Sequence, residues 1–483
     1  MTGILDRLRN LRAADAPTHG GRVLAYVYDA GVPELDELAD AAASLARPVN
    51  ALDPTVFPSV AVMEREVLGF VRRALHGRRD VVGSVTSGGT ESCLLAVKTA
   101  RDLWRAEHGS TASGRRPRLL VPATAHAAFQ KAARLFDLEL DTVPCRPDGA
   151  VAAEDVIARM DGDVALVVVS APAYPSGALD PIRAVAAAAQ AHGIRCHVDA
   201  CFGGLVLPWW TDAPAWDFRV TGVTSISADL HKYGYAPKGV SVLLHRGRRQ
   251  HRAQFFATTR WPGYPVVNPT LLGSKSASPL AASWAIVQRL GDSGFAELTA
   301  SIRRVATGIR SEVDGIPGLV VLGDPVGPAL ALIADPTAMP ALRVDPHRLA
   351  DELARRGWRI QHQPGFVQAD GTRLPRSAHL TLTPVLEREL GGFRRALVQA
   401  ADAVRGRPPA DGRALAAAVR ALGYGARRVP GPAAAWRLLR LAGAARATSD
   451  RPLAGLMALV EELPAPVAEA LLTELLARLS EPR

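Results

Sequence analysis

Only five of the 57 basic residues in this chain of 483 residues are lysines. Arginine serves well as a solvated cation but does not lose its proton, so a site that needs a nucleophilic amine must keep a lysine. Lys232 follows the apolar, β-branched run Val223–Ser227 and precedes a glycine-containing turn and a second strand-like run, Gly239–His245. This pattern places the amine on a turn at a strand end, either in a reactive site or in a surface hairpin.

A carboxylate and a glycine-rich turn accompany this lysine. The apolar stretch Ile194–Val198 predicts a strand that ends at Asp199. The segment Ser87–Ser92, SGGTES, predicts a turn that leads into a helix whose first N–H groups can bind a phosphate. An amine, an anion and a phosphate-binding turn are the groups needed to hold pyridoxal 5'-phosphate by its aldehyde, its ring nitrogen and its phosphate.

The sequence resembles the group II pyridoxal-phosphate decarboxylase superfamily, and within it most closely the sphingosine-1-phosphate lyases of the bacterial type. The matching stretches are VFPSVAVMEREV, VTSGGTESCLLAVKTARD, ATAHAAFQKAA, HVDACFGG, DFRVTGVTSISADLHKYGYAPKGVSVLLHR, LADELARRGWRIQ and HLTLTP. A glycine-rich turn alone is a weak signal, whereas this ordered set is specific.

The resemblance implies an α/β protein of pyridoxal-phosphate fold type I, the aspartate aminotransferase-like fold, acting as a homodimer. It divides the chain into four parts. These are an N-terminal arm (1–60), a large cofactor-binding domain with a mainly parallel sheet (61–285), a smaller α+β domain (286–405) and a helical C-terminal extension (406–483).

The cofactor contacts follow from the residues and the resemblance together. Lys232 would bind the cofactor aldehyde and act as a nucleophile, and Asp199 would keep the ring nitrogen protonated. Gly89 and Thr90 open a helix and would bind the phosphate, although Thr90 also suits an ordinary helix cap. His231 is similar to the family histidine that contacts the phosphate, but read alone it is a structural hydrogen-bonding residue.

Further roles rest on the resemblance. His126 aligns with the aromatic side chain that stacks on the cofactor ring. Tyr174 and Lys238 match positions that line the lyase substrate site, where Tyr174 would transfer a proton and Lys238 would bind a substrate phosphate. Ser274 lies in a loop that reaches the cofactor phosphate of the neighbouring subunit.

Two positions depart from the family pattern. Asp53 stands where the family commonly has a histidine, after the same Asn-Ala-Leu in an arm that lies over the active site. Lys275 stands where the lyases have an arginine followed by proline. The arm with Asp53 helps to choose the substrate, and the altered loop with Lys275, like Asp53, weakens the case for the family's own substrate.

Alternating strand-like and helix-like stretches predict the sheet that holds these residues. The expected strands are 118–121, 138–143, 164–170, 195–199 and 223–227, and the expected helices are 33–46, 90–105, 125–135, 153–160 and 181–192, with a helix from Met63 leading to the glycine turn. After a long helical stretch (279–290 and 294–313), the smaller region is expected to contain strands 319–322, 329–333, 358–362 and 379–383 and helices 346–356 and 386–405. Such alternation indicates a largely parallel sheet whose site lies beyond the carboxyl ends of its strands.

Composition sets further limits. The net charge of +10 comes largely from residues 401–446, where nine arginines face two aspartates, and we expect a solvated or acidic-partner-facing helical segment rather than a nucleic-acid site. The four cysteines lie in apolar surroundings typical of reduced thiols, without metal-ligand spacing. The first residues contain no long apolar run, so we expect a cytoplasmic protein without a transmembrane anchor.

Three functions remain open at this point. The leading interpretation is a pyridoxal-phosphate-dependent carbon–carbon lyase, an aldehyde-lyase, that cleaves a phosphorylated amino alcohol, such as a sphingoid base 1-phosphate, to an aldehyde and phosphoethanolamine. The alternative is an amino-acid decarboxylase, a carboxy-lyase, on the same scaffold. A non-catalytic or nucleic-acid-binding protein with this fold is disfavoured because Lys232 and Asp199 are both present. In either enzyme the substrate is a small-molecule amine.

Overall fold

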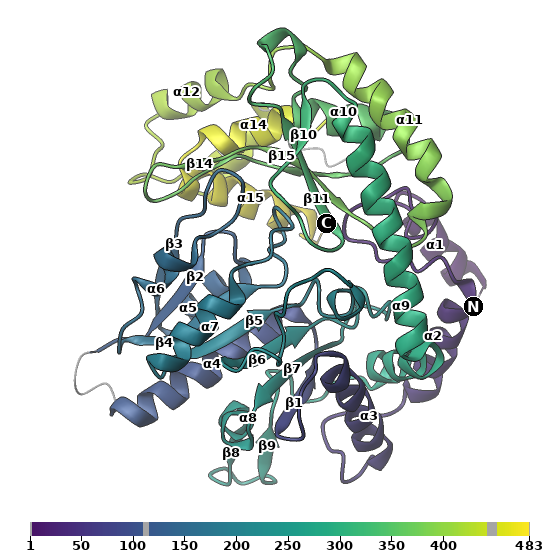
Figure 1. The fold of residues 1–483 in the computed structure, drawn as a ribbon, viewed down its shortest axis with the longest axis vertical. Coiled ribbons are helices and arrows are strands. Elements are labelled where there is room, and N and C mark those ends of the chain that lie inside the picture. The colour runs from purple at the N-terminus through teal and green to yellow at the C-terminus, as the bar shows by residue number, and fades with distance from the viewer. Residues whose placement is uncertain (1, 110–114, 442–451, 483) are drawn as a thin grey trace.

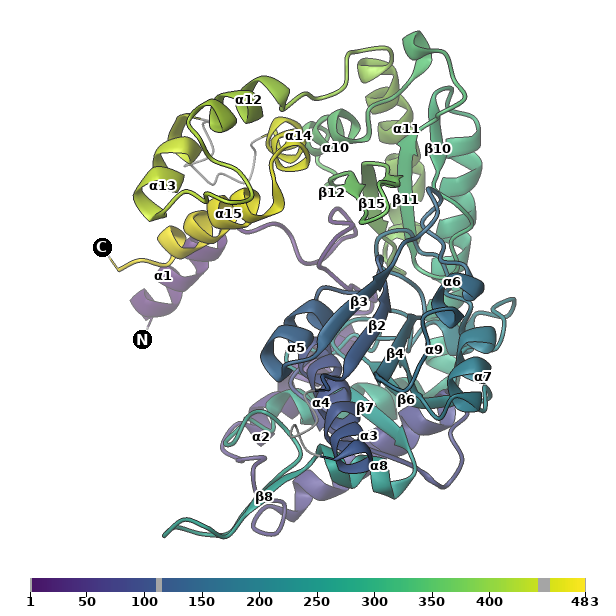
Figure 2. The same ribbon diagram turned by 90° about the vertical axis from the view of Figure 1, so that its left-hand side faces the viewer.

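The structure is a computed structural model that describes residues 2–109, 115–441 and 452–482. Figures 1 and 2 show a large sheet between helices, a smaller sheet beside it, and a group of C-terminal helices at one edge. The last part of the arginine-rich segment, 442–446, lies outside the described residues. Within the described ranges, no helix is both long enough and apolar enough to cross a bilayer.

The large sheet has seven strands in the order β1-β7-β6-β5-β4-β2-β3. In this sheet β7 is antiparallel to both of its neighbours, and the other pairs are parallel. Strand β4 reads VALVVVS and is buried along its whole length, as expected for a parallel strand covered on both faces. The strands are β1 (Val81–Thr86), β2 (Arg118–Pro122), β3 (Glu139–Val143), β4 (Val164–Ser170), β5 (Arg195–Asp199), β6 (Val223–Ala228) and β7 (Ser241–Arg246).

Helices cover both faces of this sheet. Alternate residues of β4 point to opposite sides: Leu166 and Val168 pack in a core with α4 and α5, whereas Val167 and Val169 pack in the main core. Figure 2 shows α4 and α7 on opposite sides of the strands. The helices of this region are α3 (Pro58–Ala74), α4 (Gly89–His108), α5 (Ala128–Phe136), α6 (Ala153–Ile157), α7 (Ile182–Ala191) and α8 (Arg248–Gln254), and a hairpin of β8 (Phe256–Thr258) and β9 (Val266–Asn268) follows α8.

A smaller antiparallel sheet follows the long helix α9 (Ser278–Asp314), which is interrupted at Gly291, where φ is +53°. Its strand order is β10-β11-β15-β12, and α9 packs against α11 and β10. The elements are β10 (Leu319–Val321), β11 (Ala329–Ala334), α10 (Pro346–Arg355), β12 (Gln361–Gln363), β15 (Ser377–Thr381) and α11 (Leu386–Val404), with a separate hairpin of β13 (Phe366–Val367) and β14 (Arg373–Leu374).

Both ends of the chain contact the smaller sheet region. In the N-terminal arm, which contains α1 (Thr2–Arg12) and α2 (Pro33–Ala46), Val23 forms a bridge with Arg359. At the other end, the Asp351 side chain accepts hydrogen bonds from the N–H groups of Leu453 and Ala454 and so caps α14. The C-terminal helices are α12 (Arg413–Ala421), α13 (Pro432–Leu441), α14 (Ala454–Glu462) and α15 (Ala465–Leu479).

The predicted alternation of strands and helices is confirmed, with differences at single elements. The helix predicted at 33–46 has these bounds, and the predicted break near residue 291 is present. The helix predicted at 153–160 ends at Ile157, and the strand predicted at 358–362 lies at Gln361–Gln363. The prediction that a helix leads directly to the glycine turn missed the edge strand β1.

Candidate active site

A cavity of about 600 Å³ lies beyond the carboxyl ends of β4, β5 and β6. This is where a parallel sheet places residues that follow its strands. The structure brings almost the whole predicted set together here, since the cavity is lined by Gly89, Thr90, His126, Tyr174, Asp199, His231, Lys232 and Lys238.

Lys232 lies on the turn between β6 and β7, as predicted. Its Nζ is 3.0 Å from Oδ2 of Asp229, a carboxylate that is almost completely buried. Burial alone would lower the pKa of Lys232, but the Asp229 carboxylate raises it above its ordinary value. In this structure the amine is therefore a partly buried cation held beside an anion, at the floor of the cavity.

Asp199 is the last residue of β5. Its Oδ1 accepts a hydrogen bond of 3.0 Å from the N–H of Cys201 and one of 3.4 Å from the Ser227 hydroxyl. Burial would raise the pKa of Asp199, but His126, His197 and the Cys201 N–H together hold it below its ordinary value. The structure thus keeps a negative charge at the position predicted to face a ring nitrogen.

The glycine turn connects β1 to the start of α4. Gly88 has φ of +153°, and it precedes α4 without a side-chain cap from the described residues, so the first N–H groups of the helix are open to an anion. A Cβ on Gly89 would lie 2.6 Å from Oδ2 of Asp229. Glycine is therefore required here because the turn passes directly over the Lys232–Asp229 pair.

Tyr174 lies in a chain of hydrogen bonds at the cavity wall. Its hydroxyl donates to Oε1 of Gln361 at 2.6 Å, and Nε2 of Gln361 donates to the Tyr26 hydroxyl at 2.9 Å. Its ring packs against His379 with the ring centroids 4.3 Å apart. Burial raises the pKa of Tyr174. The tyrosine therefore holds its proton near neutral pH, positioned by three separate parts of the chain.

Lys238 lies at the exposed side of the cavity. Its Nζ donates to the carbonyl of His231 at 2.9 Å and lies 4.5 Å from the centroid of the Tyr28 ring. Burial and the neighbouring Lys232 lower the pKa of Lys238 to about 8. The Lys238 ammonium is thus a second cation at the exposed side of the cavity, where a substrate anion can reach it.

Tyr26, Tyr28 and Gln361 are among the cavity-lining residues that the sequence reasoning missed. Burial raises the pKa of Tyr28, which also makes an edge contact with Tyr233 at 5.1 Å. The pair of tyrosines in the segment AYVYDAG was the available signal, because two aromatic hydroxyls in an irregular arm are unusual. Asp229, two residues before His231, was a second overlooked signal.

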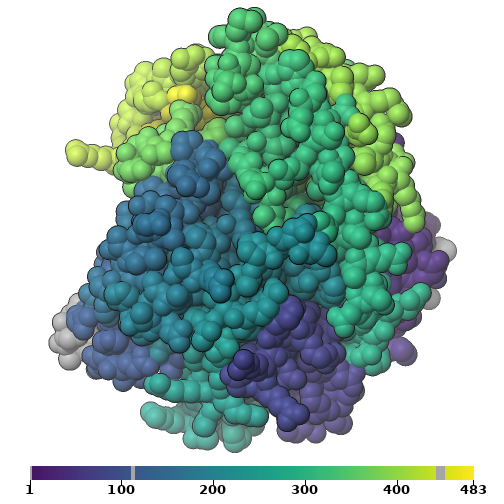
Figure 3. All heavy atoms as spheres, viewed as in Figure 1, coloured from purple at the N-terminus to yellow at the C-terminus, as the bar shows by residue number. Residues whose placement is uncertain are grey.

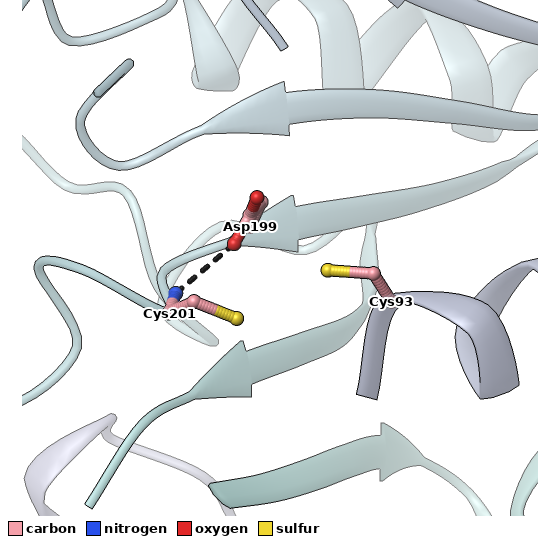
Figure 4. A group of neighbouring side chains, drawn as sticks. All are labelled: Cys93, Asp199 and Cys201. Atoms are coloured by element: carbon pink, nitrogen blue, oxygen red, sulfur yellow. Dashed lines mark hydrogen bonds between the residues drawn. The ribbon is translucent and has the colours of Figure 1, made fainter. Parts of the chain in front are cut away.

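Two cysteines lie beside Asp199 in this cavity (Figure 4). The sulfur atoms of Cys93 and Cys201 and a carboxylate oxygen of Asp199 lie within 4.8 Å of one another, a proximity that the cysteine spacing did not indicate. A hydrogen bond with Cys201 lowers the pKa of Cys93, but burial and nearby carboxylates raise it overall, and the contact with Cys93 and burial raise that of Cys201. Protonated thiols are poor metal ligands, so we interpret Cys93 and Cys201 as packed side chains of the cavity wall.

Ser274 is the one predicted cofactor-binding residue that lies elsewhere. It lines a second, open cavity of about 1050 Å³ together with Asp53 and Lys275. The loop is tied to the N-terminal arm, because the N–H of Ala51 donates to the Lys275 carbonyl at 2.8 Å. A contact of Ser274 with the site of a neighbouring subunit stays a prediction.

Fold and site together define a pyridoxal-phosphate enzyme of fold type I, and comparison with known proteins agrees. The family described as pyridoxal-dependent decarboxylase conserved domain matches residues 36–264. The chain is 35% identical to sphingosine-1-phosphate lyase from rice, over 79% of this chain and 69% of the rice enzyme. It is also 35% identical to sphingosine-1-phosphate lyase 1 of the rat, over 80% of this chain and 65% of the rat enzyme, so it spans less than two thirds of that relative.

A solved structure supports the same relationship. The sphingosine-1-phosphate lyase of Burkholderia pseudomallei superposes with a TM-score of 0.75 at 34% identity, over 87% of this chain and 94% of that one. The chain therefore belongs to the pyridoxal-dependent decarboxylase family, within its sphingosine-1-phosphate lyase branch.

The residues present fit pyridoxal 5'-phosphate. Lys232 would hold the aldehyde, Asp199 the ring nitrogen, and the open N–H groups around Gly89 and Thr90 the phosphate. The glycine positions leave the space that such a group needs, since a Cβ on Gly88 would lie 3.2 Å from the His231 ring. When bound, pyridoxal phosphate supplies an aldehyde that joins amines and a ring that accepts an electron pair.

Proposed function

We propose that this protein is a carbon–carbon lyase that cleaves a phosphorylated amino alcohol, of the sphingoid base 1-phosphate type, to an aldehyde and phosphoethanolamine. The observation that carries the proposal is the placement of Tyr174 and Lys238 in the same cavity as Lys232 and Asp199. Tyr174 and Lys238 supply a proton-transferring hydroxyl and a second cation. A decarboxylation also needs a proton donor, but it does not require a cation for a substrate phosphate.

Each residue has a proposed task in that reaction. Lys232 would hold the cofactor aldehyde and serve as the nucleophile, while Asp199 would provide the negative charge that keeps the ring nitrogen protonated. His231 and the first turn of α4 bind the cofactor phosphate, and His126 covers the ring. These assignments rest on the positions in the cavity and on the matching family motifs.

Tyr174 is proposed to move the proton that the cleavage transfers. As the bond between the two carbons breaks, the hydroxyl carbon becomes the aldehyde and its hydroxyl loses a proton, while the carbon that carries the amine gains a proton. The cleavage therefore has no net proton change, and a group beside both carbons can pass a proton between them. Because burial raises the pKa of Tyr174, this hydroxyl begins the reaction as a proton donor. Gln361 holds it in place through the 2.6 Å hydrogen bond.

The lining of the cavity disfavours an amino-acid substrate. Among the described residues, none of those that line it is an arginine, the side chain that holds a carboxylate with two parallel hydrogen bonds. Gln361, a neutral amide, extends into the cavity from the smaller sheet instead. A phosphate, in contrast, could reach the Lys238 ammonium.

An assay with sphinganine 1-phosphate and a panel of amino acids, run side by side, tests the proposal. Aldehyde from the phosphorylated base without carbon dioxide from any amino acid is the expected result. Carbon dioxide from an amino acid without aldehyde from the phosphorylated base would replace the lyase by a decarboxylase, and Lys238→Ala would then have little effect.

Lys238 gives the lyase a predicted pH dependence. With its pKa lowered to about 8, mainly by burial and then by Lys232, the amine is charged below that pH and neutral above it. KM for the phosphorylated substrate should therefore increase as the pH rises through about 8, while kcat changes less. Lys238→Arg keeps its charge and should flatten this profile. An equally steep increase in the arginine variant would rule out Lys238 as its source.

We also propose that the protein is a homodimer in which the Gly273–Lys275 loop completes the partner's site. The β8–β9 hairpin nearby exposes apolar side chains for a partner to cover, among them Trp261, Tyr264 and Val267. Sedimentation should show a dimer, and Trp261→Asp should shift it toward monomer with loss of cofactor. A monomer that keeps both cofactor and full turnover would contradict this assembly.

The proposed division of the chain is the N-terminal arm (1–60), the large domain (61–285), the smaller domain (286–405) and the helical extension (406–483). We propose a cytoplasmic location, which all four cysteines support because they are buried and unpaired, as in a reducing compartment. Cell fractionation tests the location, and recovery outside the cytoplasm would contradict it.

A further inference from the structure

The C-terminal extension carries a concentrated positive charge that the proposed reaction does not use. Residues 406–441 contain seven arginines and one aspartate. All seven arginine side chains are exposed: Arg407, Arg413, Arg420, Arg427, Arg428, Arg437 and Arg440. They lie on α12, on α13 and on the segments beside them. Figure 2 shows both helices at the outer edge of the C-terminal group, and Figure 3 shows part of this region in yellow-green at the upper left.

The packing of the extension turns these arginines outward. Helices α12 and α13 bury small and apolar residues such as Val419, Leu438 and Leu439 against α14 and α15. On α13, Arg437 and Arg440 lie one turn apart and so share a face of the helix. The arginines therefore lie on the side of the helical bundle that faces away from the apolar core of the bundle.

Exposed aliphatic side chains are interspersed with the arginines. Leu422 is 57% exposed, Val429 is 43% exposed and Leu441 is 78% exposed. The two aromatic residues of the segment are partly buried and lie beneath arginines, since Arg428 covers Tyr424 and Arg478 covers Trp436. Cations and aliphatic groups thus point to solvent together, while the aromatic rings do not.

We propose that the face formed by α12, α13 and the loop between them docks on an anionic lipid bilayer. Clustered arginines are attracted to anionic headgroups, and aliphatic side chains beside them can enter the boundary between headgroups and acyl chains. A nucleic acid is less well matched, because single strands are bound by exposed aromatic rings that stack on bases. The inference goes beyond the proposed function and rests on charge and exposure alone.

The extension is fixed to the rest of the protein, so docking would orient the whole molecule. Glu461 of α14 is almost buried, accepts a hydrogen bond from the Gly365 N–H at 2.9 Å and forms an ion pair with Arg376. Asp351 holds the start of the same helix. The basic face therefore keeps a constant position relative to the smaller sheet.

Vesicle binding by the full-length holoenzyme tests this proposal. We expect cosedimentation with vesicles of phosphatidylcholine and phosphatidylglycerol, little with phosphatidylcholine alone, and release at high salt. The triple change Arg427→Gln, Arg437→Gln and Arg440→Gln should weaken binding by on the order of 100-fold, because each arginine near an anionic surface contributes roughly a factor of five. Leu422→Ser should weaken it further without changing the salt dependence.

A control variant that removes the same number of charges elsewhere on the protein distinguishes an effect of this face from an effect of net charge. Arg134, Arg183 and Arg388 are exposed and lie outside the extension, and replacing all three by glutamine should leave vesicle binding almost unchanged. Vesicle binding is measured without substrate, so failure of the proposed reaction would not affect this test, and both triple variants should keep the turnover of the parent protein. Equal loss in both variants, binding to oligonucleotides but not to vesicles, or a dimer that dissociates in the Arg427 triple variant would each overturn the proposal.

Discussion

Replacing Lys232 by alanine is expected to reduce turnover by on the order of 10⁴-fold or more, as the loss of a catalytic nucleophile does in other enzymes. The structure gives this amine no substitute. Lys238 is the other lysine that lines the cavity, and its ammonium donates to the His231 carbonyl on the exposed side. Borohydride reduction of the holoenzyme, followed by peptide mapping, should find the cofactor on Lys232.

The control for this variant is a lysine outside the site. Lys131 is exposed on α5, so Lys131→Ala should keep both the cofactor absorbance and the turnover of the parent protein. Lys232→Ala leaves the almost completely buried Asp229 carboxylate without its cation, so circular dichroism should first show that the variant is folded. A borohydride label on Lys238 or Lys275, or normal turnover without Lys232, would refute the assignment.

The residues that could be predicted from the sequence are those placed by local rules. Asp199 ends the largely buried strand β5 and Lys232 follows the β-branched strand β6, and parallel strands bring such residues to one edge of a sheet. Gly89 and Thr90 lie at the start of a helix, where the first N–H groups have no carbonyl partner within the helix. Strand, turn and helix signals within about ten residues were therefore enough to find the floor of the cavity.

The upper wall of the cavity could not be found in this way. Tyr26 and Gln361 are 335 positions apart in the chain, and their hydrogen bond depends on how the arm packs on the smaller sheet. No periodic pattern marks either residue. The position of Ser274 poses the same problem at a larger scale, because its proposed partner would belong to a second copy of the chain.

Strand β1 was missed for a local reason. It contains Gly83, and glycine inside a run weakens the strand signal. The structure explains the glycine, since a Cβ at this position would lie 2.2 Å from the Leu243 carbonyl oxygen of β7. The close approach of the β1 and β7 backbones requires glycine at this position. Because glycine has no side chain, the sequence lacks the residue that would have indicated a strand here.

Asp199→Asn is expected to keep the cofactor and lose roughly 10²- to 10³-fold in kcat, a loss typical of a removed preorganised electrostatic contact. The amide oxygen can still accept the hydrogen bond from the Cys201 N–H, so the turn after β5 should be preserved. What the variant lacks is the negative charge, and a neutral amide cannot keep the ring nitrogen of a bound cofactor protonated. Absorbance of the bound cofactor and single-turnover rates measure the two effects separately.

A neighbouring carboxylate provides the control that distinguishes this role from a structural one. Asp180 is also buried, accepts a hydrogen bond of 2.7 Å from the Ser170 N–H and does not line the cavity. Burial raises the pKa of Asp180 to about 7, so it is partly protonated near neutral pH and Asp180→Asn changes the charge less. That variant should keep kcat within a few-fold. If Asp199→Asn did the same with its cofactor bound, the Asp199 charge would have no part in the reaction, and its low pKa would reflect only the packing around β5.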